Sequence, residues 1–365
     1  MITWNMQASW PPPTVDKLRA KLMPKDMHHL YVIGTEECEN TIAKSVLVPS
    51  KRRWEEFLGQ VLGANYQIVC GHALQATHSI VFAHSTVVGN ISNIKSAAVS
   101  TGLGRGNKRL GNKGGIGISL CVGTTSFLFI TAHLAAHNKG LERRNEEYHT
   151  ITSNLTRRLF SEDSELLSHS ATTTPENPIS SSVCHEEEDD DAHPVDQSET
   201  GSPTESDKNS TDTPLAPVDH VFWAGDLNYR VDATRETADK LTASGDLEAL
   251  LLHDQLRNVL RQGGAFSGMR EARITFQPTY KYDSDSDVFD SSAKQRIPSW
   301  TDRILYKAET ASLVEIVAYD SVQDIRISDH RPVFADFRVR VCMGTGATVT
   351  SNEMGETTSQ VCGIM

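Results

Sequence analysis

The chain has 365 residues, of which 38% are hydrophobic and 22% are charged, as in soluble globular proteins. It contains no apolar run of about 18 residues and no basic-then-apolar N-terminal segment, so we expect neither a membrane-spanning helix nor a secretory signal. Its six cysteines show no paired spacing, and we expect reduced thiols of a cytosolic protein rather than a disulfide framework or a zinc site.

Charge is distributed unevenly along the chain. The net charge is −12, but residues 161–219 hold sixteen Asp and Glu residues against one Lys, which leaves about +3 on the rest. This acidic segment, rich in Ser, Thr and Pro, cannot bury enough apolar surface to offset the entropy of ordering, so we expect a disordered insert. It is either a regulatory, phosphorylated segment or a tolerated surface loop. The slightly basic remainder suits an anionic substrate.

Short apolar segments and segments of helical spacing alternate on both sides of the insert. In chain order we expect a strand at His29–Gly34, a strand at Ser126–His133, a helix at Leu141–Phe160, a strand at Val221–Gly225, a helix at Asp246–Gln262 and a strand at Pro332–Val341. Strands in both flanks predict one α/β domain, built from residues 1–160 and 220–341. A polar, flexible tail is expected at 342–365.

Polar residues gather at the ends of the apolar strands. These are Asn5, the pair Glu36 and Glu37, His133, the pair Asp226 and Asn228, Asp302, and the pair Asp329 and His330. A single acid at a strand end is often only a turn residue. Six such ends together indicate a cleft on rigid supports, and oxygen donors without a Cys or His cluster favour Mg²⁺ over zinc. Carboxylates and histidines beside Mg²⁺ are typical of phosphate-ester hydrolysis.

Seven sequence blocks carry a resemblance to a known family. In order they are Thr3–Met6, Gly111–Gly115, Thr131–Leu134, Trp223–Arg230, Pro278–Asp283, Pro298–Arg303 and Ser328–Val333. Together they resemble the inositol polyphosphate 5-phosphatase family, over residues 1–341 apart from the insert. The resemblance implies the α/β endonuclease/exonuclease/phosphatase (DNase I-like) fold, a two-sheet β-sandwich flanked by helices with its site at one end.

The same resemblance implies a role for each strand-end residue. Asn5 and Glu37 would hold Mg²⁺. Asp226 would be the general base for the attacking water, and Asn228 would orient that water or a phosphate oxygen. His133 and His330 would donate to the 5-phosphate, Asp302 would fix the His330 tautomer, and Asp329 would support the site. Water would attack phosphorus directly, without a phosphoenzyme. The family often has Gln-Glu where this chain has Glu36-Glu37, and the extra carboxylate would either tighten metal binding or face solvent.

Substrate choice depends on a second set of residues. In the family, residues matching Tyr280, Lys281, Lys294 and Arg296 grip the 4-phosphate, and phosphoinositides are therefore the expected substrates. A soluble inositol polyphosphate is an alternative substrate. A nuclease of the same fold would need a strongly basic groove, which the charge of about +3 does not favour; a non-catalytic scaffold would lack one of the catalytic residues, and all are present. We therefore expect a monomer that binds no nucleic acid.

Four details resemble the type IV branch of the family. They are Trp4–Gln7, Leu252–Leu256, Lys294–Arg296, and the terminal Cys362-Gly363-Ile364-Met365, which fits a farnesylation box on Cys362. We therefore expect a cytoplasmic enzyme attached peripherally to ciliary or Golgi membranes through a prenyl group. A prenyl-binding solubilising protein is the implied partner. The family has a fuller first strand than the two residues that precede Thr3, which would leave Asn5 poorly held.

Overall fold

The structure is a computed structural model, and it describes residues 1–10, 18–19, 22, 28–38, 51–102, 113–161, 216–308, 310 and 313–343. Most of the predicted insert, the predicted tail and Cys362 lie outside these residues. The predictions made for them, including the prenyl group, therefore stay predictions.

The first sheet joins strands from the two flanks of the insert. It contains β1 (Ile2–Asn5), β2 (Leu30–Glu36), β3 (Tyr66–Leu74), β4 (Thr77–His84), β11 (Val314–Ser321) and β12 (Val333–Val339), in the order β11-β12-β1-β2-β4-β3. The short β1 runs parallel to β2 and antiparallel to β12. A strand of four residues is therefore held on both sides, and the fuller strand typical of the family is not needed to fix Asn5.

The second sheet is built in the same way. It contains β5 (Ile91–Ser100), β6 (Gly114–Val122), β7 (Thr125–His133), β8 (His220–Asp226), β9 (Arg270–Glu271) and β10 (Asp302–Ala308), in the order β5-β6-β7-β8-β10-β9. The pair β7 and β8 is parallel, and its crossover contains a long helix, as parallel pairing requires. The insert lies in this crossover.

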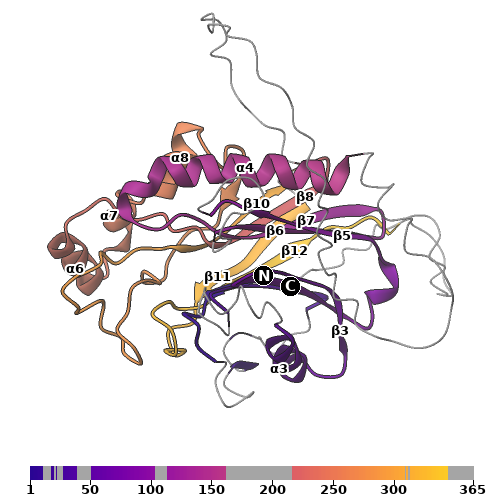
Figure 1. The fold of residues 1–365 in the computed structure, drawn as a ribbon, viewed down its shortest axis with the longest axis horizontal. Coiled ribbons are helices and arrows are strands. Elements are labelled where there is room, and N and C mark those ends of the chain that lie inside the picture. Colours follow the sequence, from indigo (N-terminus) through magenta and orange to yellow (C-terminus); the bar gives the residue numbers. More distant parts are fainter. Residues whose placement is uncertain are drawn as a thin grey trace, which may run out of the picture.

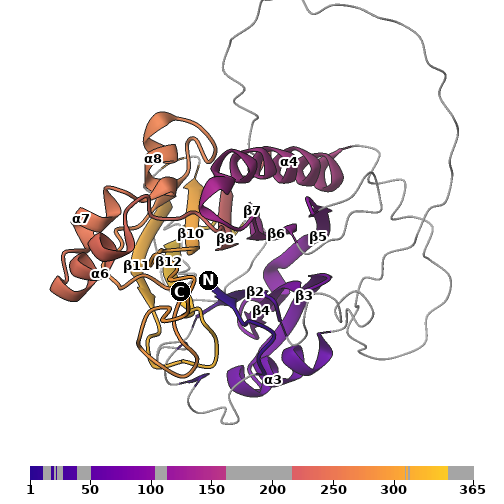
Figure 2. The same ribbon diagram turned by 60° about the vertical axis from the view of Figure 1, so that its left-hand side comes forward.

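Helices cover the outer faces of the two stacked sheets and one end of the space between them (Figures 1 and 2). The helices are α3 (Arg52–Leu62), α4 (Leu141–Phe160), α6 (Arg235–Ser244), α7 (Leu247–Leu251) and α8 (Gln255–Gln262), with 3₁₀ turns η1 (Val88–Asn90) and η2 (Asn138–Gly140). The apolar faces of α4 and α8 pack on the second sheet, α3 packs on the first, and a third apolar cluster fills the space between the sheets. This confirms the predicted fold class, a two-sheet sandwich flanked by helices.

Secondary structure agrees with the sequence except at one helix. The helix predicted at Leu141–Phe160 has these bounds in the structure, and the four predicted strands lie within two residues of the observed ones. The single helix predicted at Asp246–Gln262 is wrong, because the chain forms α7 and α8 instead. Asp254 breaks it: its carboxylate accepts the backbone N–H of Arg257 as the N-cap of α8 and also pairs with the buried Arg303.

The described residues at the edges of the insert belong to the folded body. Ser161 caps α4 through a backbone bond to Arg157, and Ala216 is buried among side chains of the cluster under α4. The Asp219 carboxylate accepts the N–H and O–H of Ser126 at 2.7 Å. Among the described helices, none combines the length and apolar composition needed to cross a bilayer.

Candidate active site

Strand register places three predicted site residues side by side at one end of the second sheet. His133, Asp226 and Asp302 are paired with one another across β7, β8 and β10. Alternate residues of these strands, such as Phe129, Phe222 and Ile304, point into the core between the sheets. Since side chains alternate along a strand, the three polar residues point into the same space at its open end.

The first sheet supplies Asn5 and Glu36 from the opposite side of this space. Asn5 pairs with Glu36 in the register of β1 and β2. Ile33 packs in the outer cluster under α3, whereas a Cβ on Gly34 would meet the Thr131 side chain of β7 at 2.6 Å, so the face that carries Gly34 and Glu36 is the inner one. Asn5 is buried and donates from Nδ2 to Asp226 Oδ2 at 3.0 Å. The two sheets therefore meet at this carboxylate.

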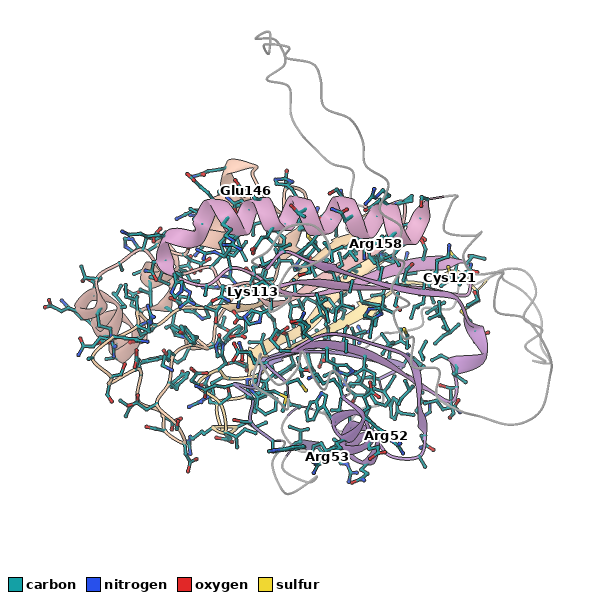
Figure 3. All side chains as sticks on the ribbon, in the orientation of Figure 1. Arg52, Arg53, Lys113, Cys121, Glu146 and Arg158 are labelled. Atoms are coloured by element: carbon teal, nitrogen blue, oxygen red, sulfur yellow. The ribbon has the colours of Figure 1, made fainter. Side chains whose placement is uncertain are left out.

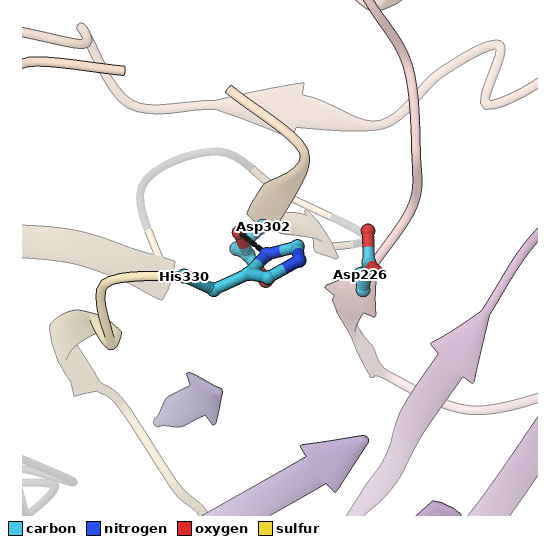
Figure 4. A group of neighbouring side chains, drawn as sticks. All are labelled: Asp226, Asp302 and His330. Atoms are coloured by element: carbon cyan, nitrogen blue, oxygen red, sulfur yellow. Dashed lines mark hydrogen bonds and ion pairs between the residues drawn. The ribbon is translucent and has the colours of Figure 1, made fainter. Parts of the chain in front are cut away.

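His330 enters the cluster from the loop before β12. Its Nδ1 lies 2.8 Å from Asp302 Oδ2, and Figure 4 shows its ring between Asp302 and Asp226. Burial works to lower the pKa of His330, but the charges of Asp302, Asp226 and Asp329 outweigh it and raise that pKa to about 10. His330 is therefore a cation at neutral pH, with Nδ1 fixed by Asp302 and Nε2 left to face a ligand.

Asp226 is the most heavily bonded acid of the cluster. Besides Asn5, its Oδ2 lies 3.2 Å from His133 Nε2, and its Oδ1 accepts the N–H of Asn228 at 3.2 Å. Burial works to raise the pKa of Asp226, but the His133 hydrogen bond and the charges of His133, His330 and Lys113 lower it well below its usual range. Asp226 is therefore ionised at neutral pH.

Glu36 does not face solvent. It is fully buried, and burial, reinforced by the charges of Asp226 and Asp302, raises its pKa well above the usual value. Its carboxylate oxygens each accept from Thr3 Oγ1 at 3.4 Å, a long and weak contact. Glu37, the predicted metal ligand, follows it after the end of β2, is half-buried, and has a φ of 50°.

Lys113 is a site residue that the sequence reasoning quoted in a motif but gave no role. It lies at the start of β6 (Figure 3), and its Nζ bonds to His133 Nε2. Burial lowers the pKa of Lys113, against the charges of Asp226, Glu37 and Glu147, which raise it. The only signal in the sequence was the Gly111–Gly115 block that contains it.

Arg230 is a second residue that received no role. Its Nη2 donates to Asn228 Oδ1 at 2.5 Å, and its guanidinium lies 4.5 Å from the ring centre of Tyr280. The Asn228 amide also donates to Leu134 O at 3.0 Å. Both polar atoms of the Asn228 side chain are thus engaged by the protein, so its water-orienting role would require one of these bonds to open.

A buried hub outside the cleft ties the loops after β7 and β8 together. Gln255 Oε1 accepts from Arg144 Nη2 at 2.5 Å and from the N–H of Arg230 at 3.0 Å. Arg144 Nη1 also donates to the carbonyl of His137 at 2.8 Å. Arg144 lies on the buried side of α4, whereas Glu146 is exposed. The hub fixes the loops that carry Asn228 and Arg230.

The four predicted substrate residues lie in two groups. Tyr280 packs on His330 with ring centres 4.5 Å apart, and Lys281 Nζ donates to Asp329 Oδ2 at 2.6 Å, so both adjoin the cluster. Lys294 is exposed and Arg296 is half-buried. Burial and then the charges of Arg296, Arg230, Lys113 and Lys294 lower the pKa of His137.

The donor atoms of the cluster fit a divalent cation. Asp226 and Asp302 each offer a carboxylate oxygen, and these two atoms lie within 4.8 Å of each other. Asp302 Oδ2 accepts from Thr279, Thr301 and His330, but Asp302 Oδ1 is buried without a partner. A buried carboxylate oxygen without a donor is costly unless a cation or a proton meets it. Oxygen-rich donors of this kind suit Mg²⁺.

Sandwich fold and cleft together define a class of protein, and the family comparison agrees. Residues 2–336 match the family model described as endonuclease/exonuclease/phosphatase family 2. The chain belongs to this family.

Similar proteins narrow the comparison to the predicted branch. Human phosphatidylinositol polyphosphate 5-phosphatase type IV is 32% identical over 350 residues, which are 94% of this chain and 46% of the human protein. The chain thus spans about half the length of that relative. The predicted resemblance to inositol polyphosphate 5-phosphatases, with the type IV protein among the matches, is confirmed.

Two solved structures share the fold. One is the inositol polyphosphate 5-phosphatase domain of SPsynaptojanin in complex with inositol (1,4)-bisphosphate and calcium ion; it is 26% identical, has a TM-score of 0.65, and the match covers 92% of this chain and 81% of that one. The other is the Cimex nitrophorin ferrous NO complex, at 20% identity and a TM-score of 0.63, with 93% and 96% covered. This second likeness shows the fold alone, so function has to be argued from the site.

Proposed function

We propose that this chain hydrolyses the 5-phosphate of inositol phospholipids, using Mg²⁺ and direct attack by water. The observation that carries the proposal is the buried constellation in which ionised Asp226 faces the His330–Asp302 pair, with Tyr280 and Lys281 beside it. The similar proteins are named as 5-phosphatases, which supports the 5-phosphate ester as the bond that is hydrolysed.

Each residue of the cluster has a physical task in this reaction. Ionised Asp226, held by Asn5 and His133, accepts a proton from water. Cationic His330 donates from Nε2 to a phosphate oxygen as charge develops, since Nδ1 is engaged by Asp302. Asn5 and Glu37, together with the unbonded Asp302 Oδ1, would hold Mg²⁺, and the bound ion would supply charge stabilisation at the phosphoryl oxygens.

Lys281 is the side chain best placed to bind a neighbouring phosphate. It bonds to Asp329, and the His330 Nε2 lies 3.9 Å from the other oxygen of that carboxylate. The Lys281 ammonium, beside the residues that would hold the reacting phosphate, would bind a second phosphate on the same inositol ring. Lys294 and Arg296 add positive charge at the rim.

A soluble inositol polyphosphate is the second candidate substrate. The observation that favours it is the similar 5-phosphatase domain solved with inositol (1,4)-bisphosphate, a compound without lipid chains. Lipid and soluble substrates share the phosphorylated inositol ring, and the described cleft residues are the ones that would contact this ring.

A substrate panel with product identification tests the proposal. Purified chain with Mg²⁺ is incubated with vesicles of phosphatidylinositol 4,5-bisphosphate or 3,4,5-trisphosphate, with inositol 1,4,5-trisphosphate, and with DNA. We expect the 4,5-bisphosphate to yield the 4-phosphate. Release of the 4-phosphate group, or DNA cleavage without lipid activity, would refute the proposal, and activity on the soluble compound alone would favour the second candidate.

Membrane attachment is proposed from the sequence alone. Farnesylation of Cys362 would give reversible binding, because a single lipid chain anchors weakly, and a prenyl-binding protein would then carry the enzyme to ciliary or Golgi membranes. Equal membrane fractions of wild type and Cys362→Ser in eukaryotic cells would refute the anchor without touching the catalytic proposal.

A further inference from the structure

The buried acids of the cleft differ in how their charges are balanced. Asp329 pairs with Lys281, Asp302 with His330, and Asp226 with His133, at 2.6, 2.8 and 3.2 Å. Glu36 is the exception. Among the described residues, no basic side chain forms an ion pair with it, and its hydrogen bonds come from the Thr3 hydroxyl at 3.4 Å. Glu36 is therefore the buried acid of this cleft that has no ion-pair partner among the described residues.

The position of Glu36 shows that its carboxyl group faces the cleft and not the solvent outside it. Glu36 has no exposed surface and is the register partner of Asn5, whose amide bonds to Asp226. The inward face of β2 directs it at the same space as Asp226 and Asp302. It is part of the lining of the cation cluster.

A second carboxylate in this lining is also incompletely satisfied. Asp302 is fully buried, and its Oδ1 accepts no hydrogen bond. A buried carboxylate oxygen without a donor is costly, and buried carboxylates are usually paired or bound to a metal ion. The Glu36 carboxyl group and the unbonded Asp302 Oδ1, which face the same space, together indicate an oxygen-rich cation site with one acidic group more than Asp226 and Asp302 supply.

We propose that Glu36 is an additional ligand group, direct or through water, for the divalent cation of this cleft. It strengthens Mg²⁺ binding relative to the same site with a glutamine. The inference rests on the Mg²⁺ site of the proposed function and goes beyond it by assigning Glu36 to the cation. Glu36→Gln keeps the shape of the side chain and removes only the carboxyl group's ability to bind a cation as an anion, so it is the natural test.

The test measures cation binding without reference to turnover. The full chain, stripped of metal with EDTA, is titrated with MgCl₂ by calorimetry, and thermal melts are recorded with and without Mg²⁺. We expect Glu36→Gln to weaken Mg²⁺ binding by about 10- to 100-fold, as loss of a supporting ligand group does. Without metal, the Tm of Glu36→Gln should stay close to that of wild type, because glutamine keeps the shape of the side chain and can still accept from the Thr3 hydroxyl. Mg²⁺ should raise the Tm of the variant less than that of wild type.

Glu271→Gln is the matched control. Glu271 in β9 is an acid whose charge is balanced by Arg303, with Oε2 2.5 Å from Nη2. Its loss should lower the Tm equally with and without Mg²⁺ and leave the affinity unchanged.

Three outcomes separate this inference from the proposed function. Equal Mg²⁺ affinity in wild type and Glu36→Gln, or a Tm lowered equally in both conditions, would overturn the inference while leaving the hydrolase proposal intact. Glu36-dependent Mg²⁺ binding in a chain that releases no phosphate would support the inference and refute the hydrolase proposal. Absence of Mg²⁺ binding in wild type would overturn the inference together with the Mg²⁺ site.

Discussion

Asp226 is the side chain on which the proposed reaction depends most directly. As the base that accepts a proton from water, it should affect turnover more than substrate binding. We expect Asp226→Asn to lower kcat by at least about 10²-fold, within the range of general acid–base catalysis. The asparagine can still bond to Asn5 and His133, so the fold should survive, and steady-state kinetics with a thermal melt measure both effects.

A surface acid provides the control for this variant. Asp239 on α6 pairs with Arg235 at 2.7 Å, and its side chain is 47% exposed. Asp239→Asn should leave kcat within experimental error of wild type. Near-normal kcat in a folded Asp226→Asn enzyme would show that another group takes the proton.

Sequence reasoning located most of the cluster because strand ends are readable from apolar periodicity. It could not find the inward orientation of Glu36, because β2 is buried on both faces and its sequence shows no alternation. Lys113 and Arg230 were overlooked because their importance depends on which loops meet across the cleft. Lys113 bonds to His133 where the neighbouring strands β6 and β7 begin and end, and Arg230 lies over the ring of Tyr280, 50 residues further along the chain.

Elements were predicted well where a single periodicity decided them. The helix α4 has its apolar residues at helical spacing and was assigned to the residue. The break between α7 and α8 depends on Asp254, whose second role is a tertiary ion pair with Arg303. The local sequence pattern alone could not show that an N-cap would form at Asp254 in place of a continuous helix.

The contact between the edge strands β3 and β5 predicts a pH-dependent stability. His72 in β3 bonds through Nδ1 to Ser96 Oγ in β5 at 3.0 Å, and burial, with the charge of His78, lowers the pKa of His72 to about 4. In the unfolded chain a histidine titrates near about 6.5, so on acidification the unfolded state takes up the proton first. The free energy of unfolding should therefore fall as the pH falls from the unfolded to the folded pKa.

Removing the titrating group tests this sign. We expect His72→Asn to lose less stability than wild type between about pH 7 and pH 4, measured by urea denaturation at several pH values. Ser96→Ala serves as control, since it removes the hydrogen bond but keeps the imidazole, and it should retain most of the wild-type slope. Identical slopes in wild type and His72→Asn would exclude His72 as the source.

At the scale of the whole molecule, strand order was beyond sequence reasoning. β1 lies between β2 and β12, so the two ends of the described chain meet in one sheet, and β8 lies between β7 and β10 in the other. Such pairings are decided by long-range packing and not by local pattern. They also explain why Asn5, Asp226 and His330, which are hundreds of residues apart at the extremes, converge at one cleft.

The acidic insert provides the last prediction. The described body holds its core, both sheets and the cleft without residues 162–215, and its flanks end in ordered contacts at Ser161 and Ala216. Replacing 162–215 with a short Gly-Ser linker should therefore change the Tm by less than about 3 °C, or about 1 kcal/mol, and leave kcat unchanged. A deletion extended through Pro217 is the matched control, because it removes the buried Ala216 and should lower the Tm further. A large loss of Tm in the shorter deletion would show that the insert contributes to the folded body.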